Sequence, residues 1–308
     1  MKLITPIYQK SARTKNRILN GKPVLVLMYH RVDSHAEPQL AKLTVSAESF
    51  DRQLEYFSKN YTFLTLESDW KAISKTGIVL TFDDGYAQTI ETVLPILEKY
   101  NAPATFFIPT ENIGADKEFW WDKLANAYNC CDEAFFLPSE NVKVLKSEYS
   151  YNRISEILVN FKNDARYDWI GKFLKINNLE IPDRLNYKPL NRSALTELAK
   201  HPLVKIALHT HTHPFLGKMD IDSQKAELES SVSELKTRVG DYSNFLAVPY
   251  GSYNADTVKV AKMLGINGIL LANDNYSNDN NKQSGKINRI LMPDIQGEKL
   301  KKYIRQFD

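Results

Sequence analysis

Five short apolar segments, each followed at once by polar residues, constrain the fold of this chain more than any other feature. They are residues 23–30, 77–84, 104–109, 203–209 and 245–249. Segments as apolar as these are typical of parallel strands that helices cover on both faces. Helical patterns lie between them, so the chain alternates strand and helix. This alternation predicts a doubly wound sheet or a barrel.

The helical patterns have clear starts and ends. Ser46 is typical of an N-cap, and Phe50 and Leu54 after it share one face of the predicted helix. Two further helices are predicted over residues 228–239 and 254–264, each ended by a glycine. Polar residues gather where the apolar segments end, which is where active sites assemble in barrel enzymes, so we favour a barrel.

Two stretches depart from this alternation. Residues 111–200 contain helical patterns and no obvious strand, which predicts a helical insertion between two barrel strands within a single domain spanning residues 1–308. Residues 273–286 are rich in Asn, Asp and Ser, which predicts a long mobile loop.

Charge and cysteine content exclude several classes of protein. The formal net charge of +3 is too small to indicate a nucleic-acid partner. Residues 1–30 are locally basic, which predicts either a solvated arm or a peripheral contact with an anionic membrane surface. The apolar segment Val24–Met28 is too short for a transmembrane helix and lacks a cleavage site, so we expect no signal peptide. The adjacent Cys130 and Cys131 cannot connect distant segments. We therefore expect a cytoplasmic protein, at most bound at the inner face of the membrane.

Histidines and aspartates predict a metal site. Three of the six histidines, His209, His211 and His213, fall within five residues, and Asp83 and Asp84 follow an apolar segment. Catalytic zinc takes three protein ligands, imidazole or carboxylate, and keeps one open position. The spacing of His209 and His213 predicts two imidazoles on one face of a helical turn, with His211 directed elsewhere. One aspartate can bind the metal while the other stands beside it, which indicates a metal-dependent hydrolase.

Three segments in this order resemble the first motifs of a known superfamily. The sequences TFDDG at 81–85, HTHTHP at 209–214 and VPYG at 248–251 are similar to those of the polysaccharide deacetylases, the NodB-homology or carbohydrate esterase 4 superfamily. The likeness covers residues 23–110 and about 193–272, and it does not extend to the predicted insertion. It implies a distorted (β/α)7 barrel of NodB type.

The resemblance also implies roles for individual residues. It implies a divalent metal, usually zinc, held by Asp84, His209 and His213, although such ligand sets also take Co2+ or Ni2+. It implies Asp83 as the general base that takes a proton as water attacks the acyl carbonyl. The backbone N–H of Tyr250 would help to stabilise the negatively charged oxygen that develops.

The chain departs from the family pattern at two positions. The arginine that usually opens the third motif is replaced by Ala247, and we propose that Arg289 supplies this charge from another strand. The late Leu-x-His motif that usually provides the general acid is missing, since residues 291–293 read Leu-Met-Pro. Either Asp83 carries the proton in both directions, or His30 protonates the leaving amine. His30 could also simply line the pocket.

Aromatic residues near the motifs are candidates for binding sugar rings. They are Tyr29, Tyr86, Trp120 and Tyr253, together with Pro249 of the third motif. The alternative for the adjacent tryptophans is that they anchor the insertion to the barrel.

The predicted function is removal of the acetyl group from an N-acetylated amino sugar. The substrate would be a glycan or glycolipid, such as a surface polysaccharide or a lipid-linked precursor. A deformylase of an amino-sugar glycolipid and a carbohydrate-binding member without catalytic activity are the alternatives.

Overall fold

The computed structural model describes residues 22–138 and 142–308. The basic residues at positions 2–17, on which the predicted contact with a membrane surface rests, lie outside these ranges. Within them, no helix combines the length and the apolar character needed to cross a membrane.

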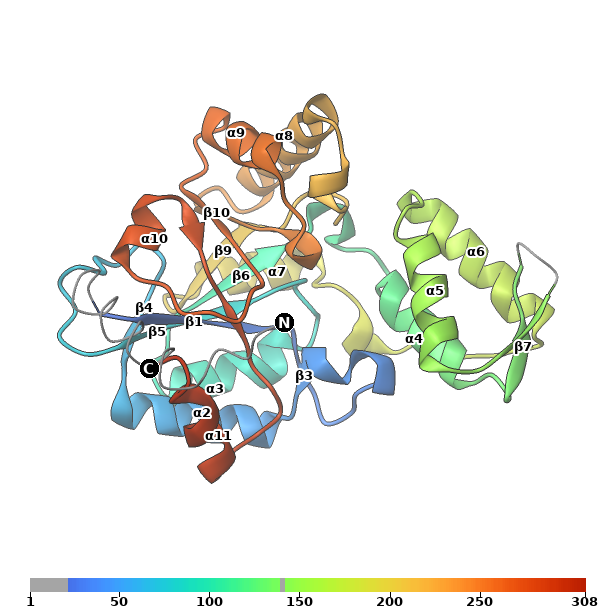
Figure 1. Cartoon of the computed structure of the whole chain (residues 1–308), viewed down its shortest axis with the longest axis horizontal. Coiled ribbons are helices and arrows are strands. Elements are labelled where there is room, and N and C mark those ends of the chain that lie inside the picture. The colour runs from blue at the N-terminus through green and yellow to red at the C-terminus, as the bar shows by residue number, and fades with distance from the viewer. Residues whose placement is uncertain (1–21, 139–141) are drawn as a thin grey trace, which may run out of the picture.

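A nine-stranded parallel sheet forms the centre of the fold (Figure 1). The strand order is β12-β11-β10-β9-β6-β5-β1-β13, with β4 pairing beside β5. The strands are β1 (Val24–Tyr29), β4 (Thr62–Leu64), β5 (Gly77–Phe82), β6 (Ala104–Ile108), β9 (Val204–Leu208), β10 (Ser243–Ala247), β11 (Gly268–Leu270), β12 (Lys286–Ile287) and β13 (Ile290–Leu291). Helices surround this sheet, namely α2 (Ala47–Asn60), α3 (Leu94–Lys99), α7 (Arg192–Lys200), α8 (Ile221–Arg238), α9 (Ala255–Met263) and α11 (Gly297–Ile304).

The sheet curls into a barrel because its two ends belong to one short segment. β12 pairs with β11 at one end of the strand order, and β13 pairs with β1 at the other. Only Asn288 and Arg289 separate these two strands. The edges therefore meet through a covalent link, which gives the distorted (β/α)7 barrel of NodB type and confirms the predicted fold class.

Alternating side chains of the strands fill two separate apolar clusters. In β1, Leu25, Leu27 and Tyr29 belong to the cluster shared with the surrounding helices. Val24 and Val26 belong to a second cluster, built from strand and loop residues, that fills the barrel interior. Successive residues of a strand point to opposite faces, so Tyr29 points outward and His30 inward. By the same rule, Phe82 of β5 points outward and Asp83 inward.

The predicted helix after Ser46 is confirmed as α2. The Ser46 side chain accepts a hydrogen bond from the backbone N–H of Ser49, and Phe50 and Leu54 are fully buried. The predicted loop at 273–286 is wrong in part. It contains α10 (Asp279–Gln283), and Ser277 pairs with Val24, because Asn278 provides a capping box that starts a short helix.

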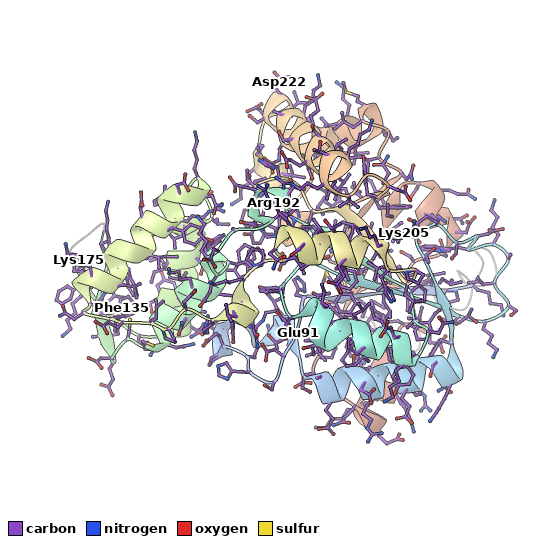
Figure 2. All side chains as sticks on the ribbon, turned by 180° about the vertical axis from the view of Figure 1, so that it is seen from behind. Glu91, Phe135, Lys175, Arg192, Lys205 and Asp222 are labelled. Carbon is purple, nitrogen blue, oxygen red and sulfur yellow. The ribbon has the colours of Figure 1, made fainter. Side chains whose placement is uncertain are left out.

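The segment between β6 and β9 stands beside the barrel (Figure 1, right). It contains α4 (Trp120–Asn129), α5 (Glu148–Leu158) and α6 (Asn163–Ile176), which share an apolar cluster of their own. Figure 2 shows the same separation from behind, with Phe135 and Lys175 far from Glu91 and Lys205.

Two details of this segment differ from the sequence expectation. It holds an antiparallel hairpin of β7 (Ala134–Phe136) and β8 (Lys143–Leu145), whereas no strand was expected. Leu195 and Leu198 of α7 pack into the main core beside β9, so α7 is a barrel helix. We therefore propose that the insertion ends before Arg192 rather than at residue 200.

Phe50→Ala should lower the free energy of unfolding by about 3–5 kcal/mol, the usual cost of removing a buried phenyl ring. Phe50 is fully buried and contacts Tyr29 and Phe82 edge to face. Urea unfolding followed by circular dichroism measures the change. Arg52→Ala, on the exposed face of the same helix, is the matched control and should change stability by less than about 0.5 kcal/mol. Equal effects of the two variants would contradict the packing described.

Candidate functional site

Asp84, His209 and His213 converge at the carboxyl end of the barrel. Asp84 follows β5, and the two histidines follow β9. One ligand atom from each lies within 4.8 Å of the others, and all three residues are buried. The Nε2 atoms of His209 and His213 lie 3.5 and 3.4 Å from Oδ1 of Asp84. The structure thus brings together the three residues predicted to hold a metal.

The hydrogen bonds around these residues fit a divalent cation. Nδ1 of His209 donates to the carbonyl oxygen of Ala247 at 2.9 Å, which leaves the lone pair on Nε2 facing Asp84. Nδ1 of His213 lies 3.1 Å from the hydroxyl of Tyr250. Oδ1 of Asp84 is buried and has no hydrogen-bond partner. Two imidazole nitrogens, each on a ring that a second contact orients, and a free carboxylate oxygen are a donor set that zinc prefers.

The charges of these groups are strongly coupled. Burial alone would raise the pKa of Asp84, but the neighbouring imidazoles of His209 and His213 hold it below its usual range. Burial lowers the pKa of His213, which favours the neutral imidazole that binds metal. Burial would also lower the pKa of His209, but the carboxylates of Asp83 and Asp84 outweigh it and raise this pKa. A bound cation would compete with that proton.

Strained backbone directs the ligands. Four of the seven non-glycine residues with positive φ in the described ranges belong to this site: Asp84 (72°), Thr210 (65°), His213 (57°) and Tyr250 (55°). Such conformations cost about 1–3 kcal/mol each and persist where the surroundings enforce them. Gly85 continues the turn with a φ of 71°, and an added Cβ would lie 2.4 Å from Cδ1 of Ile108. The turn separates the directions of the two neighbouring aspartates.

The predicted helical turn at the histidines is wrong. Residues 209–215 are not helical, because Thr210 and His213 adopt left-handed backbone conformations. The hydroxyl of Thr210 accepts a hydrogen bond from the backbone N–H of His213 at 3.1 Å. His211 points away, with Nδ1 2.9 Å from the hydroxyl of Thr110, in agreement with the expectation. A tight loop rather than a helix brings the two imidazoles together.

A buried ion pair joins Asp83 to Arg289. Nη1 and Nη2 of Arg289 donate to the two carboxylate oxygens of Asp83 at 2.7 and 2.8 Å, and both side chains are at most 3% exposed. Burial would raise the pKa of Asp83, but the Arg289 guanidinium outweighs it and lowers this pKa. Arg289 lies in the two-residue link between β12 and β13, so closure of the barrel places its guanidinium beside Asp83.

His30 lies beside the same carboxylate. Its Nε2 is 3.9 Å from Oδ2 of Asp83, and its Nδ1 is buried without a hydrogen-bond partner. Burial lowers the pKa of His30 and outweighs the nearby carboxylates, so the imidazole is neutral at neutral pH.

These polar residues line one side of a cavity of about 420 Å³. The rest of its wall is mostly apolar and comes from barrel residues such as Met28 and Leu291, from the segment Pro38–Leu43 and from the insertion. Sequence reasoning missed several residues of this wall, and four of the larger ones are Leu40, Leu43, Trp121 and Tyr151. Trp121 had a signal, since it adjoins Trp120. The other three had none.

Trp121 packs against His213, one of the three proposed metal ligands. Its ring centroid lies 4.9 Å from that of His213. Its Nε1 donates to the hydroxyl of Tyr86 at 2.8 Å, and this hydroxyl donates to Asp122 at 2.7 Å. Burial, opposed by the Arg31 guanidinium, raises the pKa of Asp122 to about 7. The insertion therefore contacts a proposed metal ligand directly.

The predicted sugar-binding residues divide into two groups. Trp120 lines the cavity, as does Tyr250, the proposed oxyanion donor. Tyr29, Tyr86, Pro249 and Tyr253 do not border it.

The structure contradicts the assignment of three of these to a sugar groove, because they are buried. Tyr29 points outward from β1 and donates its hydroxyl hydrogen to Gln53 at 2.8 Å. Tyr86 is 2% exposed and its hydroxyl is engaged by Trp121 and Asp122. Pro249 is buried in the turn that precedes Tyr250.

Comparisons with known proteins agree with this geometry. The family model described as polysaccharide deacetylase matches residues 71–269. YxkH of Bacillus subtilis (strain 168), whose name places it among the polysaccharide deacetylases, is 30% identical over 118 residues, which are 35% of this chain. The chain spans only 40% of the length of YxkH.

Solved structures share the fold. The deacetylase PplD of Streptococcus pyogenes, in complex with acetate, has a TM-score of 0.56 at 18% identity, covering 93% of this chain and 98% of that one. IcaB from Ammonifex degensii has a TM-score of 0.58 at 16% identity, covering 89% and 93%. At these identities the likeness shows the fold alone.

Asp84→Ala should abolish stoichiometric zinc binding, because it removes the one carboxylate oxygen that faces both Nε2 atoms. Elemental mass spectrometry after dialysis against zinc measures the metal content. Asp83→Asn is the matched control, since it changes the neighbouring carboxylate, which is paired with Arg289, and should keep the zinc. Loss of zinc from both variants, or from neither, would contradict the assigned ligands.

Proposed function

Because the chain belongs to the polysaccharide deacetylase family, we propose that it is a metal-dependent hydrolase that removes the acetyl group from an N-acetylated amino sugar of a glycan or glycolipid. One observation carries this proposal. The metal ligand set and the Asp83–Arg289 pair face the same cavity, so a metal and an ionised carboxylate are available to one substrate.

Four residues have proposed roles in binding the metal and activating water. Asp84, His209 and His213 would hold a divalent metal, most simply zinc. When bound, such an ion polarises the carbonyl oxygen of the acyl group. Asp83 accepts a proton from the water that attacks the carbonyl carbon.

Arg289 keeps the base in its working form. Its two hydrogen bonds fix the plane of the Asp83 carboxylate and keep it ionised. Since Ala247 has no charge, Arg289 takes the part that the third-motif arginine has in the family. The backbone N–H of Tyr250, in the turn Pro249–Gly251, is the proposed donor to the developing oxyanion.

The leaving amine needs a proton, and Asp83 is its better source. A neutral His30, with its lowered pKa, has little proton to give at neutral pH. Asp83 holds the proton that it took from water, and it can return this proton to the amine nitrogen as the carbon–nitrogen bond breaks. His30 is then a residue of the cavity wall beside Asp83.

Asp83→Asn should lower kcat about 100- to 10,000-fold while zinc content stays unchanged, since an amide cannot accept the proton. Acetate release from zinc-loaded protein on free, polymeric and lipid-linked N-acetylhexosamines measures this. Formate released from N-formyl sugars in place of acetate would identify a deformylase. A wild-type protein that binds zinc and hydrolyses no amide in the panel would instead indicate a carbohydrate-binding member and overturn the proposal.

Arg289→Lys and Arg289→Ala should move the acidic limb of the kcat/KM profile to higher pH, with alanine moving it further. Arg289 lowers the pKa of Asp83, so without it burial dominates and this pKa rises. More of the base is then protonated at a given acidic pH, and activity is lost earlier as pH falls. Lysine keeps a charge and loses the paired geometry. The lead measurement is the pH profile, with thermal melts to verify folding. An unshifted limb in a folded Arg289→Ala protein would exclude this role.

A further inference from the structure

We propose, resting on the proposed deacetylase function, that the catalytic cavity continues into an anion-binding groove. The substrate would be an acidic amino sugar that carries a phosphate or a carboxylate beside its N-acyl group. The groove lies between the insertion and the loop after His213. It is called the basic groove below, after four cationic residues along it: Arg153, Lys162, Arg166 and Lys218.

The basic groove is continuous with the catalytic cavity. A hollow of about 880 Å³ shares Trp120, Ser155 and Tyr250 with that cavity. A further hollow of about 470 Å³ continues from it past Phe215 and Lys218. A ligand with its acyl group at the metal ligands can therefore extend past Trp120 and Tyr250 into the groove.

Positive charge exceeds negative charge along this path. The four cationic side chains are accompanied by two acidic ones, Glu111 and Glu156. Glu111 is already engaged, since Nδ2 of Asn163 donates to it. Within residues 22–138 and 142–308, Lys162 and Lys218 form no ion pair with a carboxylate. The ammonium groups of Lys162 and Lys218 are thus available to an anion.

Arg166 is the most informative of the four, because it is buried and forms no ion pair with a carboxylate within the described ranges, although Glu111 lines the same hollow. It is 4% exposed, and its Nε and Nη2 donate to the carbonyl oxygens of Leu158 and Val159, both at 3.0 Å. Its guanidinium lies 5.1 Å from the ring centroid of Trp120, the residue shared by the cavity and the groove. The carbonyl end of α5 compensates part of this charge. Nη1 makes no hydrogen bond within the described part of the chain and is not fully buried, so it is open to the groove that Arg166 lines. A cation without an ion-pair partner attracts an anion, which would bind at this nitrogen.

Aromatic residues next to these charges provide a surface for a sugar ring. Phe215 stacks on Tyr250, with ring centroids 4.1 Å apart and planes 13° from parallel. Tyr250 is 44% exposed and borders the catalytic cavity as well. The ammonium group of Lys218 lies 4.6 Å from the Phe215 ring. An apolar ring face beside a cation matches a sugar bearing an anionic substituent.

Kinetics with matched sugars test the proposal on the zinc-loaded full chain. The probes are N-acetylglucosamine 1-phosphate, a disaccharide of N-acetylglucosamine and glucuronic acid, and the neutral methyl glycoside of N-acetylglucosamine. At least one acidic probe should exceed the neutral one in kcat/KM by about tenfold, as charge-assisted contacts allow. Whichever acidic probe prevails identifies phosphate or carboxylate. Lys218→Ala should remove most of this advantage, whereas Lys225→Ala, whose lysine pairs with Glu229 on α8, should not.

Binding measurements test the basic groove independently of the hydrolysis reaction. Calorimetry with the Asp83→Asn protein should show that the acidic probe binds more tightly than the neutral one, and that added salt weakens the difference. Adding Lys218→Ala should reduce the difference, which excludes direct phosphate coordination to zinc as its whole cause. If the wild-type protein hydrolyses no probe but this preference holds, the proposed function fails and the groove stands. Equal affinities for acidic and neutral probes, or a preference that Lys218→Ala leaves intact, would overturn the groove.

Discussion

The ion pair between Asp83 and Arg289 connects the architecture of the barrel with its chemistry. Arg289 belongs to the two residues that join β12 to β13, whose strand partners stand at opposite ends of the sheet. Separating the two charges would leave a buried carboxylate without compensation, which typically costs about 3–5 kcal/mol. The link that closes the barrel and the ionised carboxylate of Asp83 therefore stabilise each other. In this chain the cation comes from the end of the barrel rather than from β10, where Ala247 stands.

Two adjacent aspartates serve different partners because the backbone turns between them. Asp83 still follows the alternation of β5 and points into the barrel, where Arg289 neutralises it. Asp84 has left the strand, with a φ of 72°, and faces the imidazoles of His209 and His213. The same sequence pair thus gives one carboxylate that is paired with a permanent cation and one that keeps an oxygen free for metal. The pKa values of both aspartates are lowered, that of Asp83 by Arg289 and that of Asp84 by the two imidazoles. Only Asp84 has a carboxylate oxygen that a metal ion could contact without breaking an ion pair.

Strand positions and the convergence of Asp84, His209 and His213 could be predicted from the sequence, but the directions of several side chains could not. In β1 the inward and outward residues are all apolar, so nothing in the sequence showed that Tyr29 points away from the site. His209 and His213 meet as expected, but through left-handed residues that no spacing rule indicates. Arg289 was proposed because Ala247 stands where the family's third motif usually has an arginine. Leu40, Leu43 and Tyr151 were missed because their contacts depend on where the insertion docks, which local sequence does not encode.

Besides the residues of α5 that line the cavity, three consecutive residues of α4 bring the insertion into the site. Trp120 borders both the cavity and the basic groove, Trp121 packs against His213, and Asp122 accepts the hydroxyl hydrogen of Tyr86. Since Tyr86 follows Asp84 and Gly85 directly, α4 reaches both sides of the metal ligand set. Movement of α4 relative to the barrel would disturb a ligand and the substrate wall together. Substitution of the buried residues that hold α4 against the barrel should therefore impair activity as much as substitution of the proposed ligands. The exposed cations of α5 and of the loop at Lys218 can be substituted without disturbing these ligands, so they are free to match different substrates.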